Sequence, residues 1–161
     1  MEIAHGILTV LKQAATLFRE NGIAYCLAGG LAVSLLAKPR ATEDVDLIVL
    51  LDERDFPSFE ALVRSRFDVI QVRDVMRFRT ASIWRFILGD GNEGMVILDL
   101  ILAERDEYRE AIANAVEIVV DDCRINIITP QDLIAVKQLA GRPVDLMDIE
   151  ALREAAANGE W

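Results

Sequence analysis

The amino-acid sequence predicts an α/β (α+β) fold, with a mixed central sheet of about five strands flanked by helices. Residues 27–50 read as a strand, a glycine turn, a short helix, a loop and a second strand. Residues 67–102 change to the two-residue alternation that is typical of strands. Residues 3–20 and 129–158 instead place apolar side chains at helical spacing.

Each element follows from a local pattern. The first helix ends at Asn21-Gly22, because glycine favours the end of a helix. The run after Asp46 is fully apolar, as in a central strand buried on both faces. Residues 89–94 are rich in turn residues and predict a hairpin loop. The expected elements between the first helix and the C-terminal segment are strand 23–28, helix 31–37, strand 44–50, helix 55–64, strands 67–72, 76–79, 82–88 and 95–102, helix 107–114, and strands 115–120 and 124–128.

The C-terminal segment carries strong helix signals. Thr129 is expected to cap a helix with Pro130 in its first position, and Gly141 ends that helix. A last helix is expected over 143–157. We expect one domain spanning 1–161, with a core at about 22–128 and the helical segment at about 129–158.

Composition limits the possible classes of protein. The net charge of −10 argues against a non-specific nucleic-acid binder, which is usually basic. No run of eighteen apolar residues predicts a membrane span, and the N-terminus does not resemble a signal peptide, so we expect a cytoplasmic protein. Cys26 and Cys123 are expected to be reduced thiols, and no Cys/His cluster has zinc-binding spacing.

Three aspartates are candidate metal ligands. Asp44 and Asp46 lie two apart on a predicted strand, so they share a face with Cα atoms roughly 7 Å apart. Carboxylates held in this way repel each other unless a cation lies between them, and oxygen ligands suit Mg²⁺. Asp99 lies within an apolar strand, where a carboxylate is costly unless it is paired or metal-bound. The alternative for the Asp44/Asp46 pair is a solvated strand end.

Gly29 and Gly30 are candidates for phosphate binding. Two glycines permit a tight bend and leave room for a ligand, and the following helix directs free N–H groups at that space. Ser34, one turn into this helix, could reach a phosphate, and Arg40 could neutralise phosphate charge. A purely structural turn, a plain helix position and an unpaired loop arginine are the alternatives.

The pattern Gly29-Gly30, thirteen residues, then Asp44-Val45-Asp46-Leu47 resembles the signature of the nucleotidyltransferase superfamily, the polymerase-beta-like fold. The resemblance implies that Asp44 and Asp46 hold metal ions and that Asp99 is the third carboxylate. Many members have Gly-Ser where this chain has Gly-Gly, which removes one hydroxyl contact to phosphate.

The C-terminal segment extends this resemblance to small nucleotidyltransferases of abortive-infection toxin–antitoxin systems. In those proteins a lysine, an arginine and a downstream aspartate complete the site. By that resemblance Lys137 contacts the triphosphate, and Asp145 orients it or Arg142. Asp145 and Asp148 lie on one face of the last helix. A pair of packed helices with ion-paired faces is the alternative interpretation.

A local excess of positive charge is the remaining feature. The segment from Arg64 to Arg85 holds six arginines against two aspartates. It is either a solvated sheet face or a surface for a polyanion such as RNA or for an acidic partner.

Together these features predict an Mg²⁺-dependent enzyme that transfers a nucleoside monophosphate from an NTP to a hydroxyl acceptor, releasing pyrophosphate. The acceptor, whether a small molecule, RNA or protein, is left open. The alternatives are a non-catalytic binding module of a toxin–antitoxin pair, with a cognate partner protein, and a phosphohydrolase that uses the same carboxylates.

Overall fold

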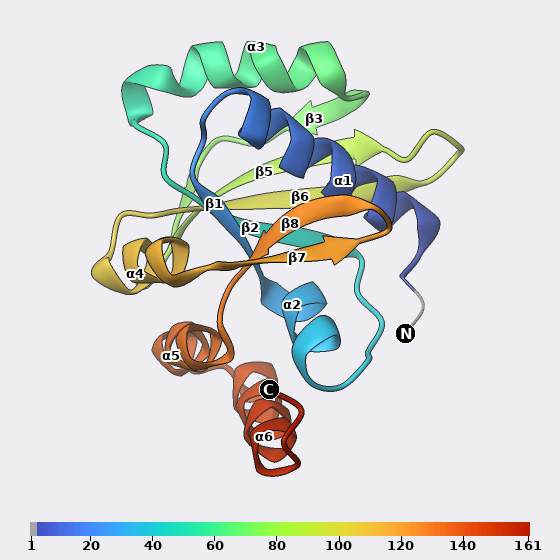
Figure 1. Ribbon diagram of the computed structural model, residues 1–161. Helices are drawn as coiled ribbons and strands as arrows, with labels where there is room; N and C mark the ends of the chain where they lie inside the picture. Colours follow the sequence, from blue (N-terminus) through green and yellow to red (C-terminus); the bar gives the residue numbers. More distant parts are fainter. Residues whose placement is uncertain (1–2) are drawn as a thin grey trace.

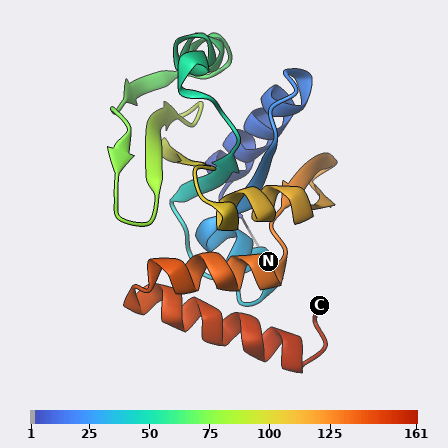
Figure 2. The same ribbon diagram turned by 90° about the vertical axis from the view of Figure 1, so that its left-hand side faces the viewer.

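A computed structural model describes residues 3–161 and shows one mixed sheet with helices on both faces (Figures 1 and 2). The sheet has eight strands in the order β3-β5-β6-β2-β1-β8-β7, with β4 paired to β5. The strands are β1 (Tyr25–Ala28), β2 (Asp44–Val49), β3 (Val69–Val72), β4 (Met76–Arg77), β5 (Ser82–Gly89), β6 (Met95–Leu102), β7 (Val116–Val120) and β8 (Cys123–Ile127). The expectation of about five strands was wrong, because the short outer strands continue the same sheet.

Strand β2 lies near the centre of the sheet. It pairs with β6 in parallel and with β1 antiparallel, and β1 pairs with β8 in parallel. The remaining pairs are antiparallel, so the sheet is mixed as predicted. Val45, Leu47 and Val49 are fully buried. The apolar run of β2 is therefore explained by burial, as expected for a central strand.

The helices form two layers around the sheet. They are α1 (His5–Glu20), α2 (Gly29–Leu36), α3 (Phe56–Arg66), α4 (Asp106–Asn114), α5 (Pro130–Ala140) and α6 (Pro143–Ala157), with a 3₁₀ turn at Glu53–Asp55. Helices α1 and α3 cover one face, and α2, α4 and α5 lie on the other, with α6 packed against α5 (Figure 1).

An aromatic cluster fastens α1 and α3 to the sheet. The Phe59 ring of α3 lies 5.8 Å from Phe18 of α1 and 5.6 Å from Trp84 of β5, centroid to centroid. Trp84 and Phe86 of β5 are buried on this face. Because side chains alternate along a strand, Arg85 between them points to the opposite face, where the site described below lies.

Most element boundaries lie within a few residues of those expected. Thr129 caps α5 by accepting a hydrogen bond from the Asp132 N–H at 3.2 Å, and Gly141 ends it at φ 65°. Two details were wrong. Helix α2 begins at Gly29 rather than after the glycines, and strand β8 begins at Cys123 rather than at Arg124. Both cysteines are free thiols. Among residues 3–161, no helix is both long and apolar enough to cross a lipid bilayer.

Candidate active site

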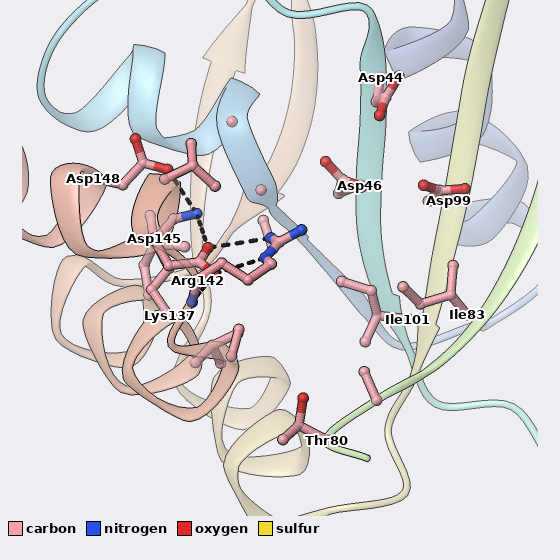
Figure 3. A pocket seen from close by; sticks show the side chains of 18 of the residues that line it. Asp44, Asp46, Thr80, Ile83, Asp99, Ile101, Lys137, Arg142, Asp145 and Asp148 are labelled. Carbon is pink, nitrogen blue, oxygen red and sulfur yellow. Dashed lines mark hydrogen bonds and ion pairs between the residues drawn. The ribbon is translucent and has the colours of Figure 1, made fainter. Parts of the chain in front are cut away.

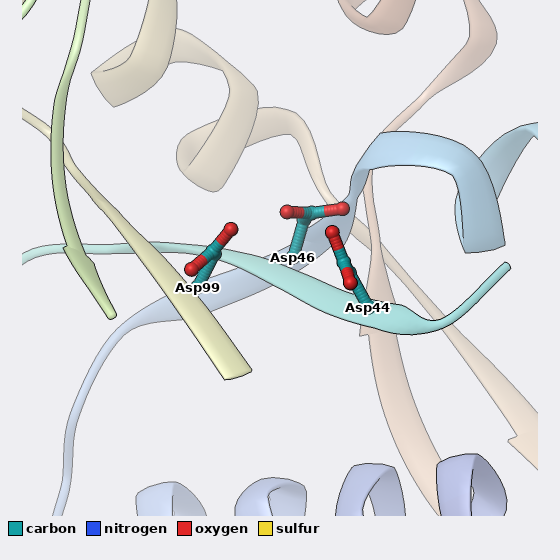
Figure 4. Close-up of side chains that lie close together, drawn as sticks. All are labelled: Asp44, Asp46 and Asp99. Carbon is teal, nitrogen blue, oxygen red and sulfur yellow. The ribbon is translucent and has the colours of Figure 1, made fainter. Parts of the chain in front are cut away.

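The three predicted acidic residues lie together on the face of the sheet opposite the aromatic cluster (Figure 4). Asp44 and Asp46 are on β2, and Asp46 is directly opposite Asp99 on the neighbouring parallel strand β6. One oxygen from each carboxylate lies within 4.8 Å of the others. Strand pairing has therefore brought together two sequence positions that are more than fifty residues apart.

This cluster, which we call the carboxylate triad, is electrostatically strained. Burial, reinforced by the charges of Asp99 and Asp44, raises the pKa of Asp46 to about 7. Burial and the charge of Asp99 also raise the pKa of Asp44. Three hard oxygen donors that disfavour one another's charge are a donor set that suits a divalent cation such as Mg²⁺. The residues present therefore fit the ion that the sequence predicts.

Gly29 allows the backbone to pass close to the triad. Its φ of +65° is a left-handed conformation that residues with a Cβ disfavour. A Cβ at Gly29 would also overlap the Asp46 carboxylate, and one at Gly30 would lie 2.7 Å from Arg40 Nη2. The glycine pair thus places the first turn of α2 directly beside the predicted metal ligands.

An arginine completes the acidic cluster. Arg85 on β5 lies opposite Asp99 in the β5–β6 pairing and donates two hydrogen bonds, from Nε to Oδ1 and from Nη2 to Oδ2, each at 2.8 Å. The sequence analysis grouped Arg85 with the other arginines of its segment and missed this role. The expected hairpin brought these two strands together but left Gly89 in its loop, so it did not fix the register; in the structure Gly89 pairs with Met95, which sets Arg85 against Asp99.

Cationic side chains from the C-terminal helices face the triad across the cavity (Figure 3). Lys137 Nζ of α5 lies 3.4 Å from Asp145 Oδ1 and 2.9 Å from Asp148 Oδ2, both on α6. Arg142 pairs with Asp145 at 2.8 Å, and Arg40 pairs with Asp148 at 3.2 Å. These five residues form one alternating chain of charges, which we call the ion-pair chain.

Lys137, Asp145 and Asp148 are all nearly buried. The hydrogen bonds from Arg142, with help from the charge of Lys137, lower the pKa of Asp145 despite its burial. The sequence analysis considered Asp148 only as part of an ion-paired helix face, and the structure shows that it also joins the loop that carries Arg40 to the helices. The three cations exceed the two acids by one charge, which leaves this side of the cavity positive.

The triad, the glycines and the ion-pair chain line a single cavity of about 600 Å³. This volume lies within the ordinary range for small-molecule sites. Ser34 does not line it: its hydroxyl hydrogen-bonds with the backbone N–H and C=O of Arg40 and so holds the loop instead. The rest of the wall, missed from the sequence, is mainly apolar and comes from β4 and the loop after it, β5, β6, α4, α5 and α6, with Phe78, Ile83, Ile101 and Tyr108 among its members.

The arginine-rich segment is less positive than its composition indicates. Arg64, Arg66 and Arg77 form ion pairs with Glu60, Glu20 and Glu104 respectively. Arg85 is bound to Asp99, as described above. Within the described residues, four of the six arginines are therefore neutralised by acids of the same chain.

Comparison with known proteins gives a consistent result at the level of structure. No protein-family profile matches the chain, and no curated protein sequence matches it significantly. A nucleotidyltransferase-like antigenic protein from Paracoccidioides brasiliensis matches with a TM-score of 0.66 at 23% identity, over 92% of this chain and 76% of that one. A protein from Thermotoga maritima, provisionally described as a nucleotidyltransferase, matches with a TM-score of 0.63 at 15% identity, over 98% and 96%.

An antibiotic-modifying enzyme is also similar. The lincosamide antibiotic adenylyltransferase LnuA, in its lincomycin-bound form, matches with a TM-score of 0.55 at 16% identity, over 94% of this chain and 96% of that one. These comparisons do not bear on the resemblance to toxin–antitoxin proteins, which stays a prediction. The shared architecture over nearly the whole described chain establishes that this protein has the nucleotidyltransferase fold.

Proposed function

We propose that this protein is a nucleotidyltransferase, which moves a nucleoside monophosphate from an NTP to a hydroxyl group and releases pyrophosphate. The observation that supports the proposal most is the meeting of three carboxylates within 4.8 Å beside the glycine start of α2. A solvated strand end would not bring acids from two strands into one partly buried cluster. Structural similarity to nucleotidyltransferases, including LnuA, supports the same reaction class.

The carboxylate triad would hold the divalent cation. Bound Mg²⁺ supplies positive charge to the phosphate under attack and lowers the pKa of the acceptor hydroxyl. Asp44 and Asp46 contribute two oxygens from one strand, and Asp99 contributes the third from its neighbour. Because the pKa of Asp46 is about 7, this residue must lose a proton before it can serve as a ligand at neutral pH.

The opposite wall would hold the triphosphate. The backbone N–H groups at Gly29 and Gly30 lie at the N-terminus of α2, where the helix dipole favours an anion. Arg40, Lys137 and Arg142 line the same cavity. The ion-pair chain has one more positive charge than negative charges, so its cations can still bind phosphate oxygens. Asp145 orients Lys137 and Arg142.

The apolar wall favours a compact acceptor. Ile83 and Ile101 pair across β5 and β6, one alternation from Arg85 and Asp99, and therefore share their face of the sheet. The cavity cations all have acidic partners in the described chain, and the protein carries a net charge of −10. This balance leaves little positive charge for a polyanionic acceptor beyond the nucleotide. We propose an acceptor with a hydroxyl and an apolar surface, as a small molecule or a protein side chain provides, over RNA.

Turnover of labelled NTPs tests the proposal. The protein is incubated with each NTP, Mg²⁺ and a panel of hydroxyl acceptors, and pyrophosphate and the nucleotidylated product are measured. We expect Asp44→Ala and Asp46→Ala to abolish product, whereas Asp52→Ala, in the exposed loop after β2, leaves it unchanged. Activity that survives Asp44→Ala would refute the assignment.

The same assay separates the two alternatives. A non-catalytic module would bind no NTP in an Mg²⁺-dependent way, or would bind it without turnover across the acceptor panel. A phosphohydrolase would release phosphate and leave every acceptor unmodified.

A further inference from the structure

The Arg85 side chain is fully committed to one carboxylate of the triad. Its Nε and Nη2 groups each donate to a different oxygen of Asp99 at 2.8 Å. Such a fork is the strongest arrangement between an arginine and a carboxylate. Asp99 is 6% exposed and Arg85 31% exposed, so the pair lies at the cavity wall rather than in open solvent.

Arg85 also faces the other two acids. Its pKa is raised by the hydrogen bonds to Asp99 and by the charges of Asp99, Asp44 and Asp46. With all three acids ionised, the triad carries three negative charges and Arg85 returns one. The cluster with its arginine therefore has a net charge of −2, the charge that a single divalent ion balances.

A divalent ion held by the triad must share Asp99 with this guanidinium. Each oxygen of Asp99 already accepts a charge-assisted hydrogen bond, and the guanidinium repels a second cation placed against the same carboxylate. Each oxygen keeps a second lone pair, but an ion bound there lies against the positive charge of the guanidinium, so binding of the ion to Asp99 favours loss of at least one of the two hydrogen bonds. A triphosphate in the cavity would offer the released N–H groups new acceptors.

We propose that Arg85 is a positioning residue. It hydrogen-bonds both oxygens of Asp99 in the free protein, and it releases at least one of them when a divalent ion and a nucleotide bind together. The proposal rests on the function proposed above for the triad. Divalent ions then bind weakly to the free protein and much more tightly once a nucleotide is present. Arg85 thereby couples the occupancy of the metal site to that of the nucleotide site.

Mn²⁺ binding, measured by electron paramagnetic resonance at pH 8, tests this without any turnover. Wild type, Arg85→Gln and Arg85→Lys are titrated with Mn²⁺ alone and with Mn²⁺ plus a non-hydrolysable NTP. We expect Arg85→Gln to bind Mn²⁺ at least tenfold more tightly than wild type in the absence of nucleotide. The additional tightening caused by the nucleotide should be smaller in the variant than in wild type.

Arg85→Lys separates charge from hydrogen-bond geometry. Lysine keeps the positive charge but cannot form the two-pronged contact. If both the paired hydrogen bonds and the positive charge of Arg85 oppose the ion, Arg85→Lys should bind Mn²⁺ with an affinity between those of wild type and Arg85→Gln. Arg77→Gln is the matched control, since it removes an arginine–carboxylate pair to Glu104 at the surface and should leave Mn²⁺ affinity unchanged.

The possible failures are distinguishable. If folded Arg85→Gln, verified by circular dichroism, binds Mn²⁺ no more tightly than wild type without nucleotide, then Arg85 only holds Asp99 in place and the inference is wrong. The proposed function would survive that result provided that wild type binds Mn²⁺ with nucleotide. If neither protein binds Mn²⁺ under either condition, both proposals are overturned.

Discussion

Replacing Asp46 with asparagine is expected to stabilise the metal-free protein at alkaline pH. Burial, together with the charges of Asp99 and Asp44, raises the pKa of Asp46 from 3.8 to about 7. A carboxyl group whose pKa is raised by folding favours the folded state when protonated. The stabilisation of the folded state by protonated Asp46 is fully present below about pH 4 and is lost as the pH rises through about 7. The wild-type protein therefore loses stability over this range, whereas asparagine stays neutral throughout.

The size of the effect follows from the shift in pKa. A rise of about 3 units corresponds to about 4 kcal/mol in the free energy of unfolding at pH 8. For a chain of this length, about 4 kcal/mol raises the melting temperature by roughly 10 °C. Because Asp44 and Asp99 share the repulsion, this value is the upper end of the expected gain for Asp46→Asn.

Thermal unfolding followed by circular dichroism, with EDTA present and the pH varied from 4 to 8, measures the gain. The difference between Asp46→Asn and wild type should be small at pH 4 and largest at pH 8. Mg²⁺ added together with a non-hydrolysable NTP should raise the melting temperature of wild type more than that of the variant, which lacks one of the three carboxylate ligands. Asp52→Asn, at an exposed acid, is the control. An Asp46→Asn protein no more stable than wild type at pH 8 in EDTA would refute the reasoning.

Three further outcomes are expected. Gly29→Ala should lower the melting temperature and abolish turnover, because the left-handed φ costs about 1–2 kcal/mol and the new Cβ displaces the Asp46 carboxylate; intact turnover would contradict this. Asp148→Asn should destabilise the fold by on the order of 3 kcal/mol in urea unfolding, since Lys137 loses a buried partner, and should raise KM for the NTP more than it lowers kcat. Lys137→Met should weaken NTP binding about tenfold or more in calorimetry, through loss of a charge-assisted contact; unchanged affinity would place the triphosphate elsewhere.

Local patterns predicted much of the fold and part of the site. The signals at Thr129, Pro130 and Gly141 located the start and end of α5, because they depend on a few adjacent residues. The spacing of Asp44 and Asp46 placed both on one face of a strand. The apolar surroundings of Asp99 indicated that its charge needed a partner. Each of these inferences uses only the neighbours of a residue in sequence.

Long-range pairing could not be predicted in this way. No residue pattern within β2 or β6 indicates that the two strands are neighbours. The pairing of Asp46 with Asp99 is therefore known only from the three-dimensional structure. The link from Asp148 to Arg40 likewise depends on how α6 packs beside the loop before β2. The sequence also indicated the eight strand segments, including 76–79, but only the pairing shows that all of them, and not about five, belong to one sheet.

The positive charge of the arginine-rich segment was overestimated from the sequence for the same reason. The arginine excess between residues 64 and 85 is partly cancelled by acids from other elements, such as Glu20 of α1, which pairs with Arg66. Ser34 was expected to reach a phosphate, but its hydroxyl is used by the backbone of Arg40. Side-chain partners of polar groups depend on tertiary packing, which composition does not describe.

A crystal structure with Mn²⁺ and a non-hydrolysable NTP tests the central claim most directly, since the anomalous signal of manganese locates the ion. We predict an ion bonded to oxygens of Asp44 and Asp46, shared with Asp99 and with the triphosphate, and phosphates lying over Gly29 and Gly30. A nucleotide bound elsewhere, or an ion that contacts none of the three acids, would contradict the account.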